Sequence, residues 1–279
     1  MNPTRAVRQT LAQAFALSRF NQRIGLVPFI PAGYPDLETT VALLPALEQA
    51  GATAIEIGFP FSDPIADGPV IQEAFVDTLA RKVKIADVFA TVAAARAAVS
   101  VPLVGMLSYS IVFRFGIERF VKQAKEAGFD GLILPDLPPP EAQAICNAIQ
   151  AGGLNTILLV APSTTIERRR EIARLSSGFV YYLSVSGITG ERDHLPQNLA
   201  ENVRQLKEMT DRPICVGFGV SQPKHVRQLA TIADGAIVGS AIVRLMRSNL
   251  GKGTDGITTE VSRYVRELLS DADMPATVP

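Results

Sequence analysis

Thr53-Ala-Ile-Glu-Ile-Gly58 has the composition of a buried β-strand, with one glutamate near its centre. Side chains alternate between the two faces of a strand, so Ile55 and Ile57 point one way and Glu56 points the other way, between two small residues. A carboxyl group in apolar surroundings has a perturbed pKa, which is typical of sites that transfer protons. The strand alone equally allows a second interpretation, in which Glu56 forms a buried ion pair with a helix arginine or lysine.

Short apolar runs rich in β-branched residues alternate with stretches of helical periodicity along the whole chain. Eight runs predict strands, at 25–32, 53–59, 102–107, 131–135, 155–162, 179–184, 213–217 and 235–239. Amphipathic stretches between them predict helices, at 37–50, 83–98, 113–127, 140–151, 166–175 and 198–209. Alternating units of this number favour an α/β fold, the closed parallel (β/α)8 or TIM barrel, over an open doubly wound sheet. The first unit does not open with G-x-G-x-x-G, which argues against the alternative of a dinucleotide-binding fold.

The length of 279 residues suits one such barrel, since this fold routinely reaches about 250 residues. Residues 1–279 are therefore predicted to form a single domain, and a frayed tail is expected over 271–279. An extra N-terminal helix within residues 1–20 is expected to cap one end of the barrel. Its evidence is a set of apolar residues at roughly helical spacing: Val7, Leu11, Ala14, Phe15 and Phe20.

Charge and composition exclude several classes of function. Basic and acidic residues number 27 each, so no excess charge indicates nucleic acid or an acidic membrane surface. The apolar runs fall far short of the roughly 20 residues that cross a bilayer. No acidic residue precedes Asp36, as in a transit peptide, but serine is scarce there, so a cytoplasmic location is expected. The two cysteines, Cys146 and Cys215, and the two histidines, His194 and His225, lack metal-ligand spacing, and no metal is expected.

The segment from Ile55 to Pro69, which includes the loop Phe59-Pro-Phe-Ser-Asp63-Pro-Ile-Ala-Asp67-Gly-Pro69, resembles the signature of the tryptophan synthase alpha subunit family. Other blocks continue the resemblance in the expected order over nearly the full chain: Pro28-Phe-Ile-Pro-Ala-Gly33-Tyr-Pro, Leu134-Pro-Asp136-Leu-Pro138, Ser186-Gly-Ile-Thr-Gly190, Val216-Gly-Phe-Gly219 and Val238-Gly-Ser240. The resemblance implies a lyase that cleaves indole-3-glycerol phosphate to indole and D-glyceraldehyde 3-phosphate in tryptophan biosynthesis. This retro-aldol reaction needs no cofactor in this chain.

The resemblance implies that Glu56 and Asp67 are the catalytic pair. Carbon C3 of the indole ring must be protonated before it can leave, so Glu56, with a pKa raised by its apolar surroundings, is expected to be the general acid. Asp67 is expected to stabilise the positive charge that then develops at the ring nitrogen. The ionised glutamate can next take the hydroxyl proton of the side chain. Without the resemblance, Asp67-Gly-Pro69 would more often be only a turn, and Asp63 is interpreted as structural or partner-facing.

The resemblance also implies the substrate-binding residues. Apolar residues at or near the ends of the first, third and fourth strands match positions that wrap the indole ring: Phe29, Leu107 and Ile133. Of two adjacent tyrosines only one can reach the interior, and the family register favours Tyr181. Glycine-rich sites after strands six, seven and eight are expected to bind phosphate through backbone N–H groups, with Ser240 placed to cap the next helix: Gly190, Gly217, Phe218, Gly219, Gly239 and Ser240. Thr189, in a predicted lid over 184–196, is expected to close on the catalytic aspartate.

Several interpretations remain open at this point. The first is an alpha subunit in an α2β2 complex with a beta subunit, which would carry pyridoxal phosphate and receive the indole. The second is a free-standing indole-releasing lyase, and the third is a silent regulatory subunit, which would be expected to have lost a carboxylate. Other phosphate-binding barrels of the same pathway are the fold-level alternative. The loops at Ser110-Ile-Val112 and Pro138-Pro-Pro140 depart from the family where relatives contact the beta subunit, so interface residues are not assigned.

Overall fold

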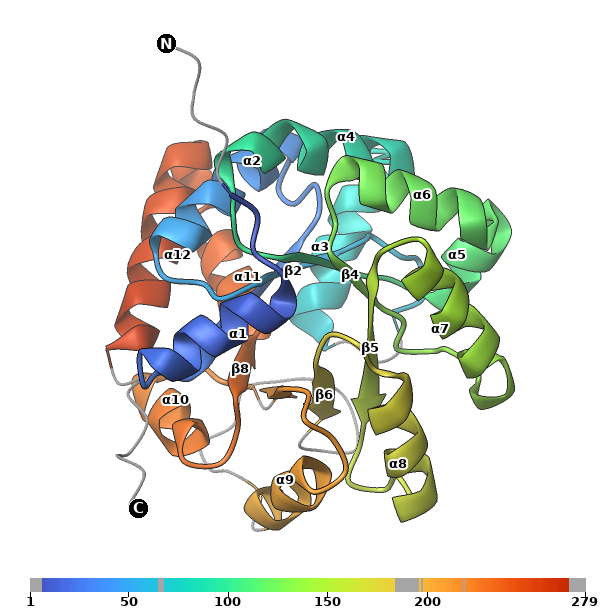
Figure 1. Ribbon diagram of the computed structural model, residues 1–279. Coiled ribbons are helices and arrows are strands. Elements are labelled where there is room, and N and C mark those ends of the chain that lie inside the picture. The colour runs from blue at the N-terminus through green and yellow to red at the C-terminus, as the bar shows by residue number, and fades with distance from the viewer. Residues whose placement is uncertain (1–6, 65–67, 184–195, 197, 218, 271–279) are drawn as a thin grey trace.

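The computed structural model describes residues 7–64, 68–183, 196, 198–217 and 219–270. Eight parallel strands form a closed barrel in sequence order, and β1 pairs with both β2 and β8 (Figure 1). The strands are β1 Gly25–Pro31, β2 Ile55–Gly58, β3 Leu103–Met106, β4 Gly131–Ile133, β5 Asn155–Val160, β6 Val180–Leu183, β7 Ile214–Gly217 and β8 Gly235–Val238. The predicted (β/α)8 barrel is therefore confirmed, and each strand lies within its predicted range.

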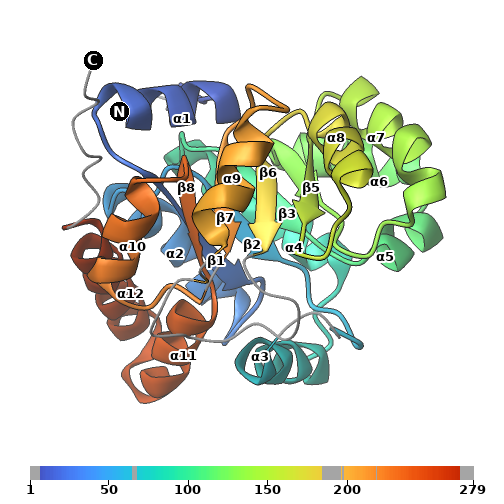
Figure 2. The ribbon, with the colours of Figure 1, turned by 90° about the horizontal axis from the view of Figure 1, so that it is seen from below.

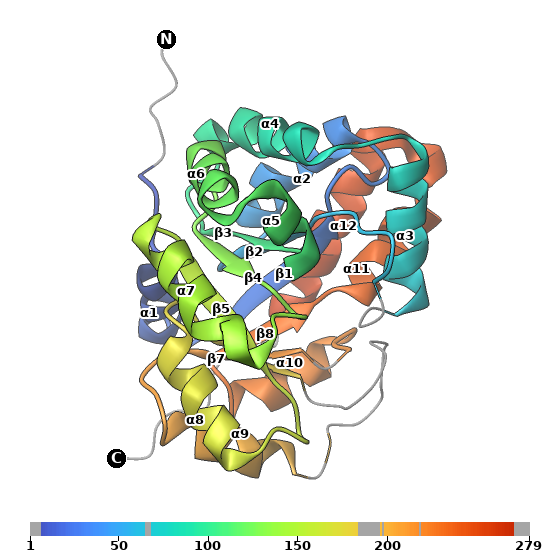
Figure 3. The same cartoon turned by 90° about the vertical axis from the view of Figure 1, so that its right-hand side faces the viewer.

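Helices surround the barrel on its outside (Figure 1, Figure 3). They are α1 Leu11–Phe20, α2 Leu37–Gln49, α3 Pro69–Ala80, α4 Ile85–Ala95, α5 Tyr109–Phe115, α6 Ile117–Ala127, α7 Ala142–Ala151, α8 Ile166–Leu175, α9 Leu199–Lys207, α10 Pro223–Ala230, α11 Ser240–Ser248 and α12 Gly253–Leu269. Short 3-10 turns lie at Arg96–Ala98, Pro139–Glu141 and Leu250–Lys252. None of the helices in the described ranges is long and apolar enough to cross a membrane.

The helix predicted over 113–127 is two helices in the structure. Gly116 separates them with φ of 88°, a conformation that other residues rarely adopt. The first of the two, α5, begins earlier than predicted because the hydroxyl of Ser108 accepts a hydrogen bond from the N–H of Ser110 and caps its first turn. The apolar periodicity continues across the break, which is why the sequence pattern does not reveal it.

Helix α1 lies across the end of the barrel where the strands begin (Figure 2). Its first turn is fixed by a capping box between Thr10 and Gln13. Phe15 closes the amino end of the barrel interior, edge to face with Phe179 at 5.9 Å between ring centres. A Cβ atom on Gly25 would lie only 2.8 Å from the Phe15 ring, so the glycine that opens β1 makes room for this plug.

The side chains of the strands divide into two apolar clusters, as alternation requires. The larger cluster lies between the strands and the helices and includes Ile55 and Ile57. The smaller one fills the inside of the barrel with Leu11, Phe15, Val27, Ala54, Val104, Ile133, Ile157, Phe179, Tyr181, Cys215 and Ile237. The inside of the barrel is thus a packed core. Because α1 covers its amino end, a ligand can approach only the end at which the strands finish.

Candidate active site

Glu56 lies on the inner face of the barrel. It shares that face of β2 with Ala54, which belongs to the interior cluster, and it stands opposite Phe29 on β1 and Val104 on β3. Only 1% of its surface is exposed. An ion pair with a helix residue would require the opposite face, where the two isoleucines of the strand pack. The structure therefore favours the first interpretation of this glutamate over the second.

The thiol of Cys215 on β7 lies within electrostatic reach of the carboxyl group of Glu56. Burial is the main cause that raises the pKa of this thiol well above its ordinary value, followed by the negative charges of Asp234 and Glu56. The strands β2 and β7 are not neighbours in the barrel, so the carboxyl group of Glu56 acts across its interior. Both cysteines are buried free thiols, as expected of inert core residues.

Four of the predicted site residues lie outside the described ranges: Asp67, Thr189, Gly190 and Phe218. The chain that leads to Asp67 departs from the carboxyl end of β2 and returns at α3, whose first residue is Pro69. Helix α3 lies toward the end of the barrel opposite α1 (Figure 2). The described segments on both sides thus belong to the same end of the fold as the carboxyl group of Glu56.

The three residues predicted to wrap an indole ring occupy different depths. The ring of Phe29 packs against Gly58 and Gly239, since a Cβ atom on Gly58 would lie 2.5 Å from it. Leu107 follows β3 and lines a cavity, whereas Ile133 is fully buried inside the barrel beneath this layer. Leu107 therefore lines the cavity, whereas Phe29 and Ile133 are buried and are not among its lining residues.

The cavity has a volume of about 350 Å³ and opens at the carboxyl ends of β2, β3 and β4. Its lining is mostly apolar, with two carboxylates: Phe59, Phe61, Asp63, Pro64, Phe75, Met106, Leu107, Ser108, Ser110, Pro135 and Asp136. Asp136 accepts hydrogen bonds from the Ser108 hydroxyl (2.6 Å) and from the N–H of Tyr109 (2.7 Å). A flat aromatic ligand suits such a space. The sequence reasoning did not assign Met106 or Asp136 to the site, although alternation along β3 points to the former.

Glycine sites line the opposite side of the barrel mouth, where β7 and β8 end side by side with Gly217 opposite Ile237. A Cβ atom on Gly217 would lie 2.7 Å from the hydroxyl oxygen of Tyr181, so any larger residue there would force a shift. Gly219 has φ of 77°, in the left-handed region. Tyr181 belongs to the interior cluster and Tyr182 to the outer one, which confirms that only one faces inward and that it is the one favoured by the family register.

Helix α11 starts directly after β8 at this side. Ser240 was expected to cap it, but the residue at the cap position is Gly239, and Ser240 is the first residue inside the helix. Among the described residues no side chain caps this first turn, so no capping bond occupies its N–H groups. Bare N–H groups at a helix start attract anions, and phosphate is the usual ligand at this position of a barrel.

Within the described part of the chain, no group of three or more histidine, cysteine, aspartate or glutamate side chains is placed to hold a metal ion. The site instead combines one buried carboxyl group, an apolar cavity and a rim of glycines. Such a site can move a proton on an aromatic ligand that carries an anionic end.

Comparison with known proteins identifies the family. The family model described as tryptophan synthase alpha chain matches residues 15–272. The chain is 44% identical over 256 residues to the tryptophan synthase alpha chain of Rhodopirellula baltica, covering 89% of this chain and 92% of the relative. It is 44% identical over 262 residues to that of Chloroflexus aggregans, covering 93% and 97%.

Solved structures agree with the sequence relatives. A structure of Mycobacterium tuberculosis tryptophan synthase superimposes with a TM-score of 0.85 at 37% identity, covering 97% of this chain and 100% of that chain. A mutant tryptophan synthase alpha-subunit from Pyrococcus furiosus superimposes with a TM-score of 0.81 at 36% identity, covering 89% and 99%. The recurrence of one family across sequence and structure settles the assignment: the chain belongs to the tryptophan synthase alpha chain family.

Proposed function

We propose that this member of the family cleaves indole-3-glycerol phosphate to indole and D-glyceraldehyde 3-phosphate, with Glu56 as its general acid and base. The observation that carries the proposal is the position of Glu56, which is 1% exposed on the inner face of β2 at the end of the barrel that is rimmed with glycines. Family membership makes the chain a lyase of tryptophan biosynthesis. The proposal concerns the residues that perform the reaction.

The reaction needs a proton at carbon C3 of the indole ring before the carbon–carbon bond can break. A buried carboxyl group holds its proton more tightly than one in water, because burial disfavours the ionised form. Glu56 donates this proton to C3 and becomes a carboxylate. The carboxylate then takes the proton of the hydroxyl on the adjacent side-chain carbon, the carbon–carbon bond breaks, and its electrons return to the ring as indole leaves. Glu56 ends the cycle protonated, as it began.

Asp67 is proposed to stabilise the intermediate. Protonation at C3 places positive charge on the ring nitrogen, and an ionised carboxylate beside its N–H lowers the energy of that state. The support is the family signature around Asp67 and the return of the chain at α3, on the same end of the barrel as Glu56. Thr189 is proposed to close on Asp67 from the loop after β6.

The substrate is proposed to lie across the barrel mouth. Its ring would contact Phe29 and Leu107, with Ile133 beneath, and its phosphate would meet the N–H groups at the ends of β7 and β8. The residues proposed for the phosphate side are Tyr181, Gly190, Gly217, Phe218, Gly219, Gly239 and Ser240. The crowded contact between Gly217 and Tyr181, together with the uncovered first turn of α11, supports this orientation.

The partner is proposed to be a tryptophan synthase beta subunit in an α2β2 complex. Members of this family contain no cofactor of their own, and pyridoxal phosphate belongs to the beta subunit. Asp63, at the rim of the cavity, is proposed to be structural or to face that partner. We propose the cytoplasm as the location of the complex.

Indole release from indole-3-glycerol phosphate, measured with and without an added beta subunit, tests the function. Strong activation by the partner is expected, while fast turnover by the chain alone would favour a free-standing lyase.

Asp67→Asn should lower indole release by about 10²-fold or more, since it removes charge stabilisation in the intermediate. Asp77→Asn, on the exposed surface of α3, is the matched control and should retain full activity. Equal turnover of the two variants would refute the role of Asp67.

A further inference from the structure

Ser221 lies in the loop between β7 and α10, two residues after Gly219. Two successive peptide groups of the chain are held there from outside the loop. The N–H of Ser221 donates a hydrogen bond to Nδ1 of His225 (3.3 Å), and its carbonyl oxygen accepts one from the hydroxyl of Tyr264 (2.9 Å). His225 belongs to α10 and Tyr264 to α12, so two separate helices hold this one residue.

His225 is the third residue of α10, which begins at Pro223. A side chain at this position often reaches back to the N–H of the cap residue, as glutamate does in a capping box. His225 reaches one residue further back, past the cap at Gln222. Its exposed fraction is 0%, so the imidazole makes this bond out of contact with water. A nitrogen that accepts a hydrogen bond carries no proton, which fixes Nδ1 as the acceptor of the ring.

The loop needs such anchors because its own residues do not stiffen it. Glycine loses more conformational freedom on folding than any other residue, and both Gly217 and Gly219 are required here, one by the nearby tyrosine and one by its positive φ. Recognition of phosphate by backbone N–H groups demands that these groups already point at the ligand. The rigidity must therefore come from outside the glycine stretch.

We propose that His225 and Tyr264 are positioning residues that hold residues 219–222, which lead from β7 to α10, in the conformation that binds the phosphate of the substrate. This inference rests on the phosphate site of the proposed function, and neither side chain is assigned a contact with the substrate. The second anchor comes from α12, the last described helix of the chain, so this helix contributes to a site at the carboxyl end of the barrel.

Three variants test the proposal. His225→Leu introduces an apolar side chain of similar size and removes the acceptor. His225→Asn restores an acceptor oxygen near the place of Nδ1. Tyr264→Phe removes only the donor hydroxyl. The probes are glycerol 3-phosphate for the phosphate end and indole for the ring end, each titrated by calorimetry. His225→Leu should raise the Kd of glycerol 3-phosphate and the KM of indole-3-glycerol phosphate by about three- to tenfold, the ordering penalty of a loosened segment. The Kd of indole should change by less than about twofold.

His225→Asn should recover most of the lost affinity, and Tyr264→Phe should weaken it in the same direction as His225→Leu. Cys146→Ala, at a buried position of α7, is the control for general destabilisation. An equal rise in the Kd of both probes, a failure of the asparagine to rescue, or an equal effect of Cys146→Ala would overturn the proposal. If the His225→Leu variant does not fold, an unchanged Kd of glycerol 3-phosphate in Tyr264→Phe would also overturn the proposal.

These outcomes separate the inference from the function on which it rests. A wild type that binds glycerol 3-phosphate with the expected dependence on His225 but releases no indole refutes the proposed reaction and supports the anchors. A wild type that releases indole, with glycerol 3-phosphate binding unaffected in all three variants, refutes the anchors alone.

Discussion

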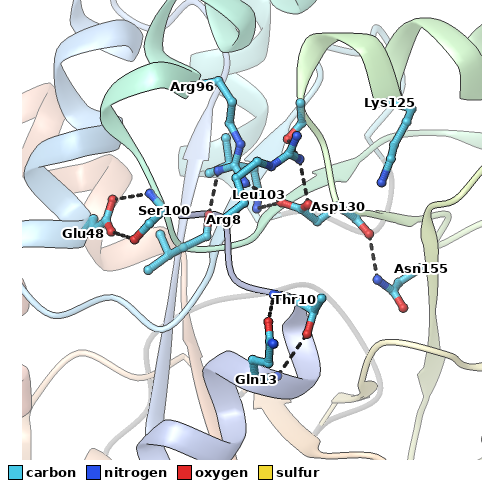
Figure 4. A network of polar contacts seen from close by, with 12 residues as sticks. Arg8, Thr10, Gln13, Glu48, Arg96, Ser100, Leu103, Lys125, Asp130 and Asn155 are labelled. Carbon is cyan, nitrogen blue, oxygen red and sulfur yellow. Dashed lines mark hydrogen bonds and ion pairs between the residues drawn. The ribbon is translucent and has the colours of Figure 1, made fainter. Parts of the chain in front are cut away.

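Replacing Asp130 with asparagine removes one negative charge from the polar network at the amino end of the barrel (Figure 4). Its carboxylate accepts hydrogen bonds from Arg8 (2.8 Å), from Arg96 (2.9 Å) and from the N–H of Leu103 (3.0 Å). The side chain of Arg96 is only 7% exposed, and burial lowers the pKa of its guanidinium while Asp130 opposes that shift. Asparagine preserves the size and one acceptor oxygen but leaves this buried charge without its nearest carboxylate.

The expected loss of stability follows from that burial. Removing one partner of a buried ion pair costs about 3–5 kcal/mol, because the remaining charge stays out of water. Arg96 also donates to the carbonyl of Val101 (2.7 Å), which places the expected loss at the lower end, about 3 kcal/mol. The pair with Arg8 adds less than about 1 kcal/mol, since that side chain is 32% exposed. The melting temperature should fall by about 6 °C or more.

Asp234 provides a matched control in the same protein. It precedes β8 as Asp130 precedes β4, and it accepts a hydrogen bond from the N–H of Ile214 (2.9 Å) on the neighbouring strand. Its cations, Arg19 and Lys207, are 63% and 40% exposed. Asp234→Asn should therefore lose only about 1 kcal/mol. Urea unfolding of both variants measures the difference, and equal losses would refute the reasoning from the buried arginine.

Three further predictions concern single side chains. Gly217→Ala should weaken glycerol 3-phosphate binding by about tenfold, because its Cβ would press on Tyr181 at 2.7 Å and force a shift; unchanged affinity in calorimetry would contradict this. The hydrogen bond to Glu141 is the main cause that raises the pKa of Tyr109 from 10.0 to about 12, so the stability it supplies is complete below pH 10 and is lost as pH rises through about 12. Tyr109→Phe should remove one late-titrating phenol from the ultraviolet titration, and an unaltered curve would argue against the bond. Burial, Asp234 and Glu56 raise the pKa of the Cys215 thiol, so a disulfide reagent should not modify it in the native protein, and fast labelling would show the interior to be open.

Local patterns in the sequence predicted the barrel and the direction of its key side chain. Short apolar runs rich in β-branched residues located all eight strands, and alternation put Glu56 on the face opposite Ile55 and Ile57, while the choice of Tyr181 over Tyr182 came from the family register. These features depend only on neighbours along the chain. The predicted cap at Ser240 was wrong because the backbone enters α11 one residue earlier, and a pattern of residue types does not resolve a shift of one position.

Other features depend on residues that are distant in sequence. Arg8, Arg96 and Asp130 are 34 or more positions apart in sequence and meet only at the amino end of β3 and β4, and nothing in their separate surroundings marks them as partners. The hold of Tyr264 on Ser221 likewise spans 43 positions. The single-domain prediction and the roles of the site residues remain predictions, and those for Asp67, Thr189, Gly190 and Phe218 fall outside the described ranges. The family signature, not the periodicity, is what points to these four.

The central claim is that the buried carboxyl group of Glu56 transfers the proton to carbon C3 that allows the carbon–carbon bond of the substrate to break. Glu56→Gln keeps the shape of the side chain and removes its ability to exchange a proton, so it should lower indole release by about 10²-fold or more. Glu48→Gln is the matched control, at the opposite end of the barrel, where Glu48 accepts a hydrogen bond from the N–H of Ser100 (2.8 Å). The decisive measurement is indole release by the two folded variants and the wild type in the presence of the beta subunit. Near-complete loss in Glu56→Gln alone is the predicted result, and turnover at the wild-type rate by Glu56→Gln would contradict the account.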